Sequence, residues 1–107
     1  MQKGVVRRML FPVGRVKISQ QILEGPTSAQ ELIDGFSRYL AGDWGDVSLQ
    51  DGLANDLAIT TGNRIVAQYS SYGGEFFYIT TYGRTTEILT SQEVAARSLK
   101  STSSAAR

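Results

Sequence analysis

The side chains of this chain that could do chemistry are carboxylates, tyrosines and basic groups. Its 107 residues include no histidine and no cysteine, so the usual general base near neutral pH and the thiol nucleophile are both missing. A catalytic triad that depends on histidine, and a zinc site built from histidine or cysteine, are therefore excluded. Carboxylates could still hold Mg²⁺ or Ca²⁺. From this inventory we expect a protein that is not an enzyme and that binds no cofactor.

Four aspartates concentrate carboxylates in the middle of the chain: Asp43, Asp46, Asp51 and Asp56. Their spacing differs from that of a Ca²⁺-binding loop, whose ligands alternate and end in a glutamate. Aspartates near the beginning of a helix also favour the helix dipole and satisfy free N–H groups without any ligand. We therefore expect no metal site, and we consider these carboxylates as a surface complementary to a basic groove on another macromolecule.

The only tryptophan lies among these aspartates, in the stretch Gly42-Asp43-Trp44-Gly45-Asp46. Tryptophan is a favoured anchor at protein interfaces, so the stretch could be a recognition loop. A corner between two helices needs the same residue types, and Trp44 would then fill the gap above a sheet. Both interpretations stay open. If the corner docks onto a partner, the residues expected at the contact are Asp43, Trp44, Asp46, Asp51 and Asp56.

A second candidate surface is basic. Residues 1–18 contain five basic and no acidic side chains, whereas residues 24–57 contain seven acidic side chains and a single arginine. A basic arm can contact phosphates, and exposed tyrosines can stack on single-stranded bases; equally, the arm can simply be solvated. In this alternative the chain binds nucleic acid through Arg7, Arg8, Arg15, Lys17, Tyr72 and Tyr82.

Two helices are expected to carry the acidic residues. Ser28 and Glu31 have the spacing of a capping box, and Gly42 suits the left-handed residue that stops a helix. The second helix is expected to begin at residue 46 or 48 and to end at residue 62 or 63. Its apolar positions recur every four residues and form a stripe that we expect to pack inward: Leu49, Leu53 and Leu57, with Ala54 and Ala58.

Strands are expected on both sides of these helices. Residues 14–19 alternate apolar and polar side chains, which predicts a short strand. Residues 64–70, 75–81 and 85–89 are rich in β-branched and aromatic residues, and glycines in the short connections predict an antiparallel meander. In the middle strand of the meander, alternation separates Phe77 from Phe76, and one of the two faces must be core.

The predicted fold class is α+β, with an N-terminal strand, two amphipathic helices, a three-stranded antiparallel β-meander with the helices on one face, and a short C-terminal helix. One domain is expected over residues 13–97, between a flexible basic arm (1–12) and a frayed tail (98–107). No apolar run is long enough to cross a membrane, and the apolar piece near the beginning is too short for a signal peptide. Together with the absence of cysteine, these features lead us to expect a cytoplasmic protein.

Several stretches together resemble a family of small uncharacterised proteins carried on bacterial plasmids, phages and integrative elements, often labelled plasmid-related or restriction-subunit-like. The resemblance covers roughly residues 13–93, and its most specific part is the stretch 42–46. In that pattern a strand is followed by a GDWG-type corner, an acidic helix with an asparagine, and a β-meander. The chain departs from the pattern in residues 78–84, where the family tends to have a tryptophan and an acidic residue. The matching residues are Gly14-Arg15-Val16, the corner, Asp51, Asn55-Asp56, Ala58, Gly62, Arg64-Ile65, Tyr69, Gly74, Ile79-Thr80, Thr86 and Ile88-Leu89.

The resemblance implies the accessory gene of a mobile element, and it brings no agreed catalytic residues. Such genes commonly serve stability, transfer or the evasion of host defence. We therefore expect a non-enzymatic binding protein that inhibits a host defence complex of the CRISPR or restriction type, by protein–protein docking through its acidic face. The expected partner is a host protein complex, with nucleic acid as the alternative and no membrane. The oligomeric state stays open.

Overall fold

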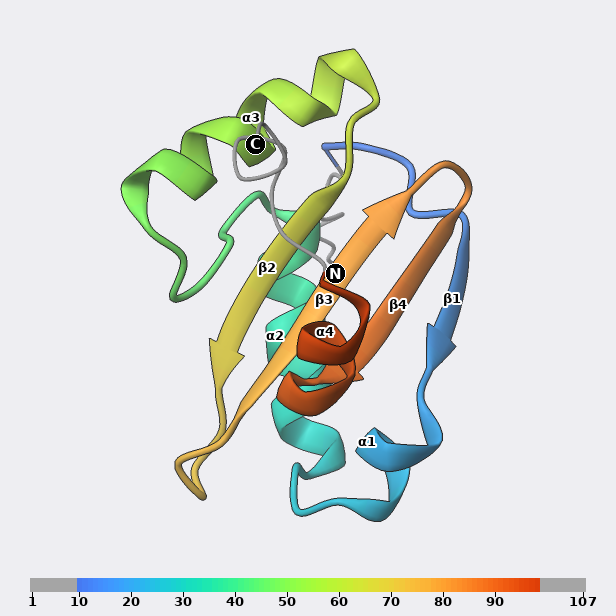
Figure 1. Ribbon diagram of the computed structural model, residues 1–107, viewed down its shortest axis with the longest axis vertical. Helices are drawn as coiled ribbons and strands as arrows, with labels where there is room; N and C mark the ends of the chain where they lie inside the picture. Colours follow the sequence, from blue (N-terminus) through green and yellow to red (C-terminus); the bar gives the residue numbers. More distant parts are fainter. Residues whose placement is uncertain (1–9, 99–107) are drawn as a thin grey trace, which may run out of the picture.

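The structure is a computed structural model that describes residues 10–98 (Figure 1). The expectations about residues 1–9, which include Arg7 and Arg8, and about residues 99–107 lie outside the described residues. Along the chain the elements are β1 Arg15–Ile18, α1 Gln20–Glu24, α2 Ala29–Leu40, α3 Leu49–Thr61, β2 Ile65–Ser70, β3 Phe76–Tyr82, β4 Thr85–Thr90 and α4 Ser91–Arg97.

The strands form one four-stranded sheet in the order β1-β4-β3-β2. Strands β2, β3 and β4 pair antiparallel, as the meander predicts. The predicted sheet of three strands was incomplete, because β1 lies parallel to β4, with Arg15 opposite Thr85 and Ile18 opposite Ile88. The alternation of residues 14–19 indicates a strand, but a strand's partner is fixed by contacts far along the chain, which local patterns do not contain.

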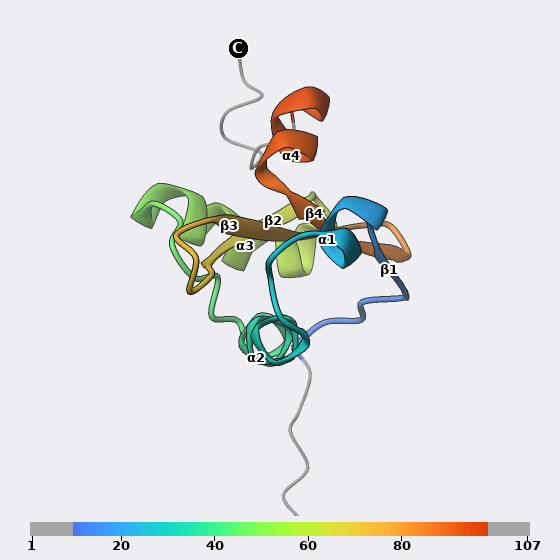
Figure 2. The ribbon, with the colours of Figure 1, turned by 90° about the horizontal axis from the view of Figure 1, so that it is seen from below.

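Helices cover both faces of the sheet, so the prediction of helices on one face was wrong. Figure 2 shows α2 below the sheet and α4 above it. Helix α4 follows β4 without a connecting loop, because Thr90 is both the last strand residue and the N-cap, in a capping box with Glu93. Two faces are therefore apolar: Phe77 and Ile79 face α2, whereas Leu89 and Val94 are buried on the α4 side.

The core between α2 and the sheet is aromatic. The ring of Tyr39 lies 5.5 Å from that of Trp44 and 5.3 Å from that of Phe11, both in edge-to-face geometry, an arrangement that aromatic rings favour. Phe11 is buried, and the Leu10 N–H donates to the carbonyl of Leu40. Residues 10 and 11, predicted to lie in the flexible arm, therefore belong to the packed domain.

A row of hydroxyl groups runs through this core. The Tyr39 hydroxyl donates to Oγ1 of Thr81 (2.6 Å), which lies 2.6 Å from Oγ1 of Thr86. The Thr86 hydroxyl in turn donates to the carbonyl of Val13 (2.7 Å). Each buried hydroxyl thus has a partner, which offsets the cost of its burial. Burial also raises the pKa of Tyr39 well above its ordinary value, and it does the same to Tyr69.

We expect the free energy of unfolding to fall as the pH rises above about 10, the ordinary pKa of tyrosine. Above that pH the unfolded chain releases phenolic protons that the folded chain still holds on Tyr39 and Tyr69, so deprotonation favours unfolding. Urea unfolding at a series of pH values, followed by tryptophan fluorescence, measures the effect. Tyr39→Phe should make the dependence shallower. Equal free energies of unfolding at pH values on either side of 10 would contradict this expectation.

Candidate functional site

Helix α3 carries much of the predicted site, and it is oriented differently from the sequence prediction. It begins after Ser48, whose hydroxyl accepts the N–H of Asp51, and ends at Gly62 with φ 82°. Leu49, Leu53 and Leu57, predicted to pack inward, are instead 82%, 56% and 65% exposed. Of the predicted stripe, Ala58 is buried, and a polar residue, Asn55, is the fully buried member of the helix.

Asn55 explains this orientation. Its side-chain amide donates to the carbonyl of Val66 (2.9 Å), and its Oδ1 accepts the N–H of Val66 (3.1 Å). The amide therefore occupies the place of a neighbouring strand beside β2. A buried edge strand needs a partner for its outward backbone groups. A leucine facing this edge would leave those groups unpaired, so the helix presents its amide to the sheet and its leucines to the outside.

The corner between α2 and α3 continues this cover along the edge of β2. The Gln68 N–H donates to the carbonyl of Trp44 (3.1 Å), and the Asp46 N–H donates to the carbonyl of Gln68 (2.7 Å). The Ser70 hydroxyl then donates to the carboxylate of Asp46 (2.5 Å). We call this arrangement, in which Asn55 and residues 44–46 satisfy the outward backbone groups of Val66 and Gln68 on β2, the covered edge.

Three of the five predicted docking residues make contacts that hold the corner between α2 and α3 in place: Asp43, Trp44 and Asp56. Asp43 forms an ion pair with Arg38 (2.8 Å) and accepts the Gly45 N–H, and the Arg38 guanidinium is the main cause that lowers the pKa of Asp43. Trp44 is 6% exposed, and its indole N–H donates to Asp56 (2.9 Å). Trp44 therefore fills the gap above the sheet, and it offers a partner no exposed ring.

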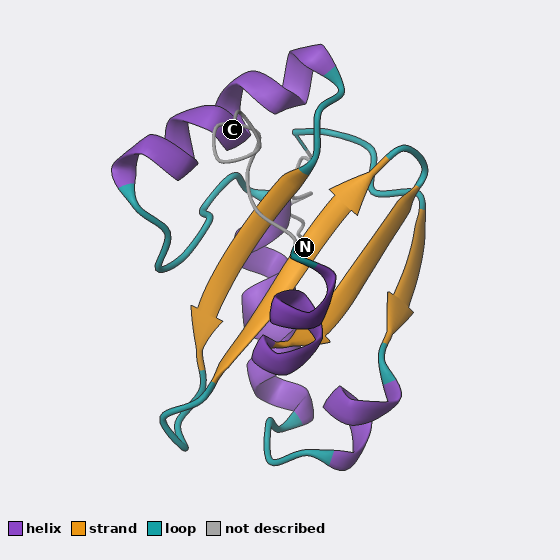
Figure 3. Cartoon of the chain, in the orientation of Figure 1, coloured by secondary structure: helices purple, strands orange, loops and turns teal. Residues whose placement is uncertain are grey.

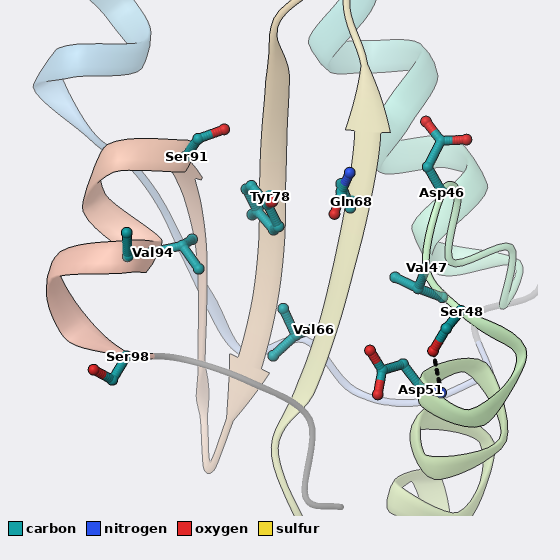
Figure 4. A pocket seen from close by; sticks show the side chains of 11 residues that line it. Asp46, Val47, Ser48, Asp51, Val66, Gln68, Tyr78, Ser91, Val94 and Ser98 are labelled. Carbon is teal, nitrogen blue, oxygen red and sulfur yellow. Dashed lines mark hydrogen bonds between the residues drawn. The ribbon is translucent and has the colours of Figure 1, made fainter. Parts of the chain in front are cut away.

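The other two predicted docking residues, Asp46 and Asp51, also have contacts within the fold, and both line a groove. Figure 4 shows this groove between the beginning of α3, the strands β2 and β3, and helix α4. Its volume is about 500 Å³. Asp46 lies at its rim, and the carboxylate of Asp51 points from α3 toward the strands. We call it the acidic groove, since its described lining contains these two carboxylates and no lysine or arginine.

The other walls of the acidic groove are apolar or uncharged. Val47, Val66 and Val94 supply apolar surface, and Gln68 and Tyr78 supply polar groups. Sequence reasoning did not assign these residues to the site. The reason is that the groove exists only because α4 lies over the sheet face opposite α2. The one local signal for this face is the alternation of Tyr78 with its buried neighbour Phe77.

The predicted nucleic-acid residues are only partly brought together. Arg15, Thr85 and Tyr82 stand in one row across β1, β4 and β3. The Arg64 guanidinium lies 5.0 Å from the centre of the Tyr82 ring. Lys17 lies two residues further along β1, opposite Glu87. Tyr72 is 95% exposed but precedes β3, whereas Tyr82 ends it, so the two tyrosines lie at opposite ends of that strand.

Two further findings concern the described residues. Among residues 10–98 no group of three or more acidic side chains is arranged to hold a metal ion. In the same part of the chain, no helix is both long and apolar enough to cross a bilayer.

Comparison with protein-family models, with curated proteins and with solved structures found no match to this chain. The resemblance to proteins of mobile elements therefore rests on the residues themselves and stays a prediction.

Proposed function

We propose that this protein is a non-enzymatic binding protein that docks onto a basic protein surface through the acidic groove. The observation that carries the proposal is the placement of two carboxylates, from Asp46 and Asp51, along a groove of about 500 Å³ with no basic residue in its described lining. Inhibition of a host defence complex would be one use of such docking. That use, and the origin in a mobile element, rest on the resemblance and stay predictions.

The chemistry of the groove suits an arginine or lysine side chain of the partner. The aliphatic stem of such a side chain can lie along Val47, Val66 and Val94, while its charged end reaches the carboxylates. The Ser70 hydroxyl occupies one oxygen of Asp46, which leaves lone pairs for a further donor. Arginine is favoured for this role because its planar guanidinium can donate two parallel hydrogen bonds to one carboxylate.

The double substitution Asp46→Asn and Asp51→Asn tests the proposal. Both changes remove charge and keep the side-chain shape, and asparagine at position 46 still offers an oxygen to Ser70. With a fluorescent peptide of alternating arginine and glycine as probe, we expect the dissociation constant from anisotropy to rise by about tenfold or more. The matched control is Asp34→Asn, an exposed carboxylate of α2 outside the groove. Equal affinities of the double variant and the control would contradict the proposal.

Nucleic acid is the second candidate partner, and one observation favours it. The sheet brings Arg15 and Tyr82 into one row and sets Arg64 over the tyrosine ring, which is the pairing of cations and aromatic rings that single strands bind. Labelled single-stranded DNA in the same assay distinguishes the two. Binding that falls steeply with salt and survives the double substitution would favour nucleic acid over a basic protein surface.

A further inference from the structure

Strand β1 forms one edge of the sheet and turns part of its backbone away from it. It pairs with β4 on one side and, within residues 10–98, has no strand on the other, as Figure 3 shows. The Arg15 N–H donates to the carbonyl of Arg84 (2.9 Å), which turns the backbone of Arg15 toward β4. Successive residues of a strand direct their backbone groups to opposite sides. The N–H and C=O groups of Val16 and Ile18 therefore point outward, where an extended segment could pair with them.

One face of β1 is apolar and only half covered. Ile18 stands opposite Ile88, which stands opposite Ile79, so Ile18 and Val16 lie on the α2 side of the sheet. Their side chains are nevertheless 42% (Val16) and 41% (Ile18) exposed. Figures 1 and 2 show the reason, because α2 lies under the middle of the sheet, to one side of β1. A strand added beside β1 could cover these two residues with apolar side chains of its own.

The other face of β1 is basic. Arg15 and Lys17 alternate with the two apolar residues, so both lie on the α4 side of the sheet. Glu87 stands opposite Lys17 but pairs with Arg97 (2.9 Å), and among residues 10–98 neither Arg15 nor Lys17 forms an ion pair. Opposite charges at neighbouring positions of two strands attract each other. This face therefore favours a neighbouring strand that carries carboxylates.

A second copy of β1 fits this edge poorly. Two identical edges that pair about a twofold axis run antiparallel, and residues directly opposite each other then lie on the same side of the sheet. In the registers that overlap the two strands most, Arg15 and Lys17 of one copy stand against Arg15 and Lys17 of the other. Like charges at opposite positions are destabilising, and charged side chains are one means by which edge strands avoid self-pairing. An acidic strand meets no such repulsion.

We propose that β1 binds an extended segment of another protein, in which carboxylates alternate with apolar side chains, as an added antiparallel strand. The antiparallel direction is the more stable pairing. The backbone of the segment pairs with the outward groups of Val16 and Ile18, and its apolar side chains cover these two residues. Its carboxylates lie beside Arg15 and Lys17. Nucleic acid would satisfy the two cations, but it has no strand backbone to pair with Val16 and Ile18.

A fluorescent peptide in which glutamate and valine alternate tests the proposal, by anisotropy with the full chain. In an antiparallel strand the valines stand opposite Val16 and Ile18, so their N–H groups donate to β1, whereas those of the glutamates point away. N-methylation of the valines should weaken binding by about tenfold or more, and the same number of N-methyl groups on the glutamates by less than about threefold. Absence of binding by the unmodified peptide, or equal losses from the two methylated peptides, overturns the proposal.

Val16→Pro makes the corresponding change in the protein. Proline removes an outward N–H and leaves the hydrogen bonds to β4, a substitution that edge strands tolerate. The dissociation constant of the peptide should rise by about tenfold or more. The matched control, Val16→Thr, keeps both the N–H and the branched shape, and should change it by less than about threefold. Urea unfolding shows whether each variant is folded, and the methylated peptides test the same hydrogen bonds on the wild-type chain.

The cations are tested by Lys17→Glu. This variant should bind the acidic peptide about tenfold or more weakly and should gain affinity for a peptide in which lysine replaces glutamate. Single-stranded DNA that binds while the acidic peptide does not overturns the proposal and assigns Arg15 and Lys17 to nucleic acid. The double substitution in the acidic groove should leave binding of the acidic peptide unchanged. Because the edge of β1 and the acidic groove involve different residues, either proposal can fail without the other.

Discussion

Asn55→Ala is expected to lower the free energy of unfolding by about 2–4 kcal/mol, because it leaves two buried backbone groups without partners. The Asn55 side chain is fully buried, and its amide makes both hydrogen bonds to the backbone of Val66. Alanine fits the helix but offers neither a donor nor an acceptor. Losses of this size are a large fraction of the stability of a small domain. Urea unfolding, followed by the fluorescence of Trp44, measures the change.

Two further substitutions make this result specific. Asn63→Ala removes an exposed asparagine just after the same helix and should change the free energy of unfolding by less than about 0.5 kcal/mol. Asn55→Asp keeps an oxygen that can accept the Val66 N–H. It also replaces the amide NH₂, which donates to the Val66 carbonyl, with a second carboxylate oxygen that repels that carbonyl. At neutral pH we expect it to be at least as costly as alanine. A cost for Asn55→Ala no greater than that for Asn63→Ala would show that the covered edge needs no amide.

Gly45→Ala is expected to cost about 3 kcal/mol or more, or to prevent folding. Gly45 has φ +76°, and an added Cβ would lie 2.0 Å from the carbonyl oxygen of Gln68 and 2.8 Å from the Tyr69 ring. The carbonyl oxygen belongs to a paired strand, so it cannot move aside without breaking its hydrogen bond from Asp46. The corner approaches β2 this closely only because residue 45 has no side chain.

Gly74→Ala is the matched control for Gly45→Ala. Gly74 has φ +86°, but an added Cβ would meet no atom within 4 Å. It therefore reports the strain of the left-handed backbone alone, which is about 1–2 kcal/mol. The difference between the two variants in urea unfolding isolates the close approach of the corner to β2. Equal costs for the two substitutions would contradict this close approach.

Local signals predict the individual elements well. The capping box of Ser28 and Glu31 is present, with both of its hydrogen bonds. Gly42 and Gly62 adopt the left-handed conformation that ends a helix. The meander also follows from its turns. Each of these features depends on residues within a few positions of one another, so the local sequence is enough to predict it.

What the sequence did not predict depends on distant contacts. The partner of β1, the face occupied by α4, and the orientation of α3 are each set by residues far apart in the chain. Asn55 is the instructive case, because the leucine periodicity of α3 favours burial of the wrong face. Only the requirement of the β2 edge for a polar partner reverses it. The candidate site depends on distant contacts in the same way. Asp46 and Asp51 line the acidic groove, while Asp43, Trp44 and Asp56 stabilise the corner.

The two edges of the sheet differ in what they can still accept. On β2 the outward backbone groups of Val66 and Gln68 are covered, whereas in the described chain β1 has a strand neighbour on one side only. Open-ended growth of a β-fibre requires every molecule to offer two free edges, one for each neighbour. This fold offers one. Strand pairing between native copies would therefore stop at two molecules, and continued polymerisation would first require Asn55 and the corner to detach from β2.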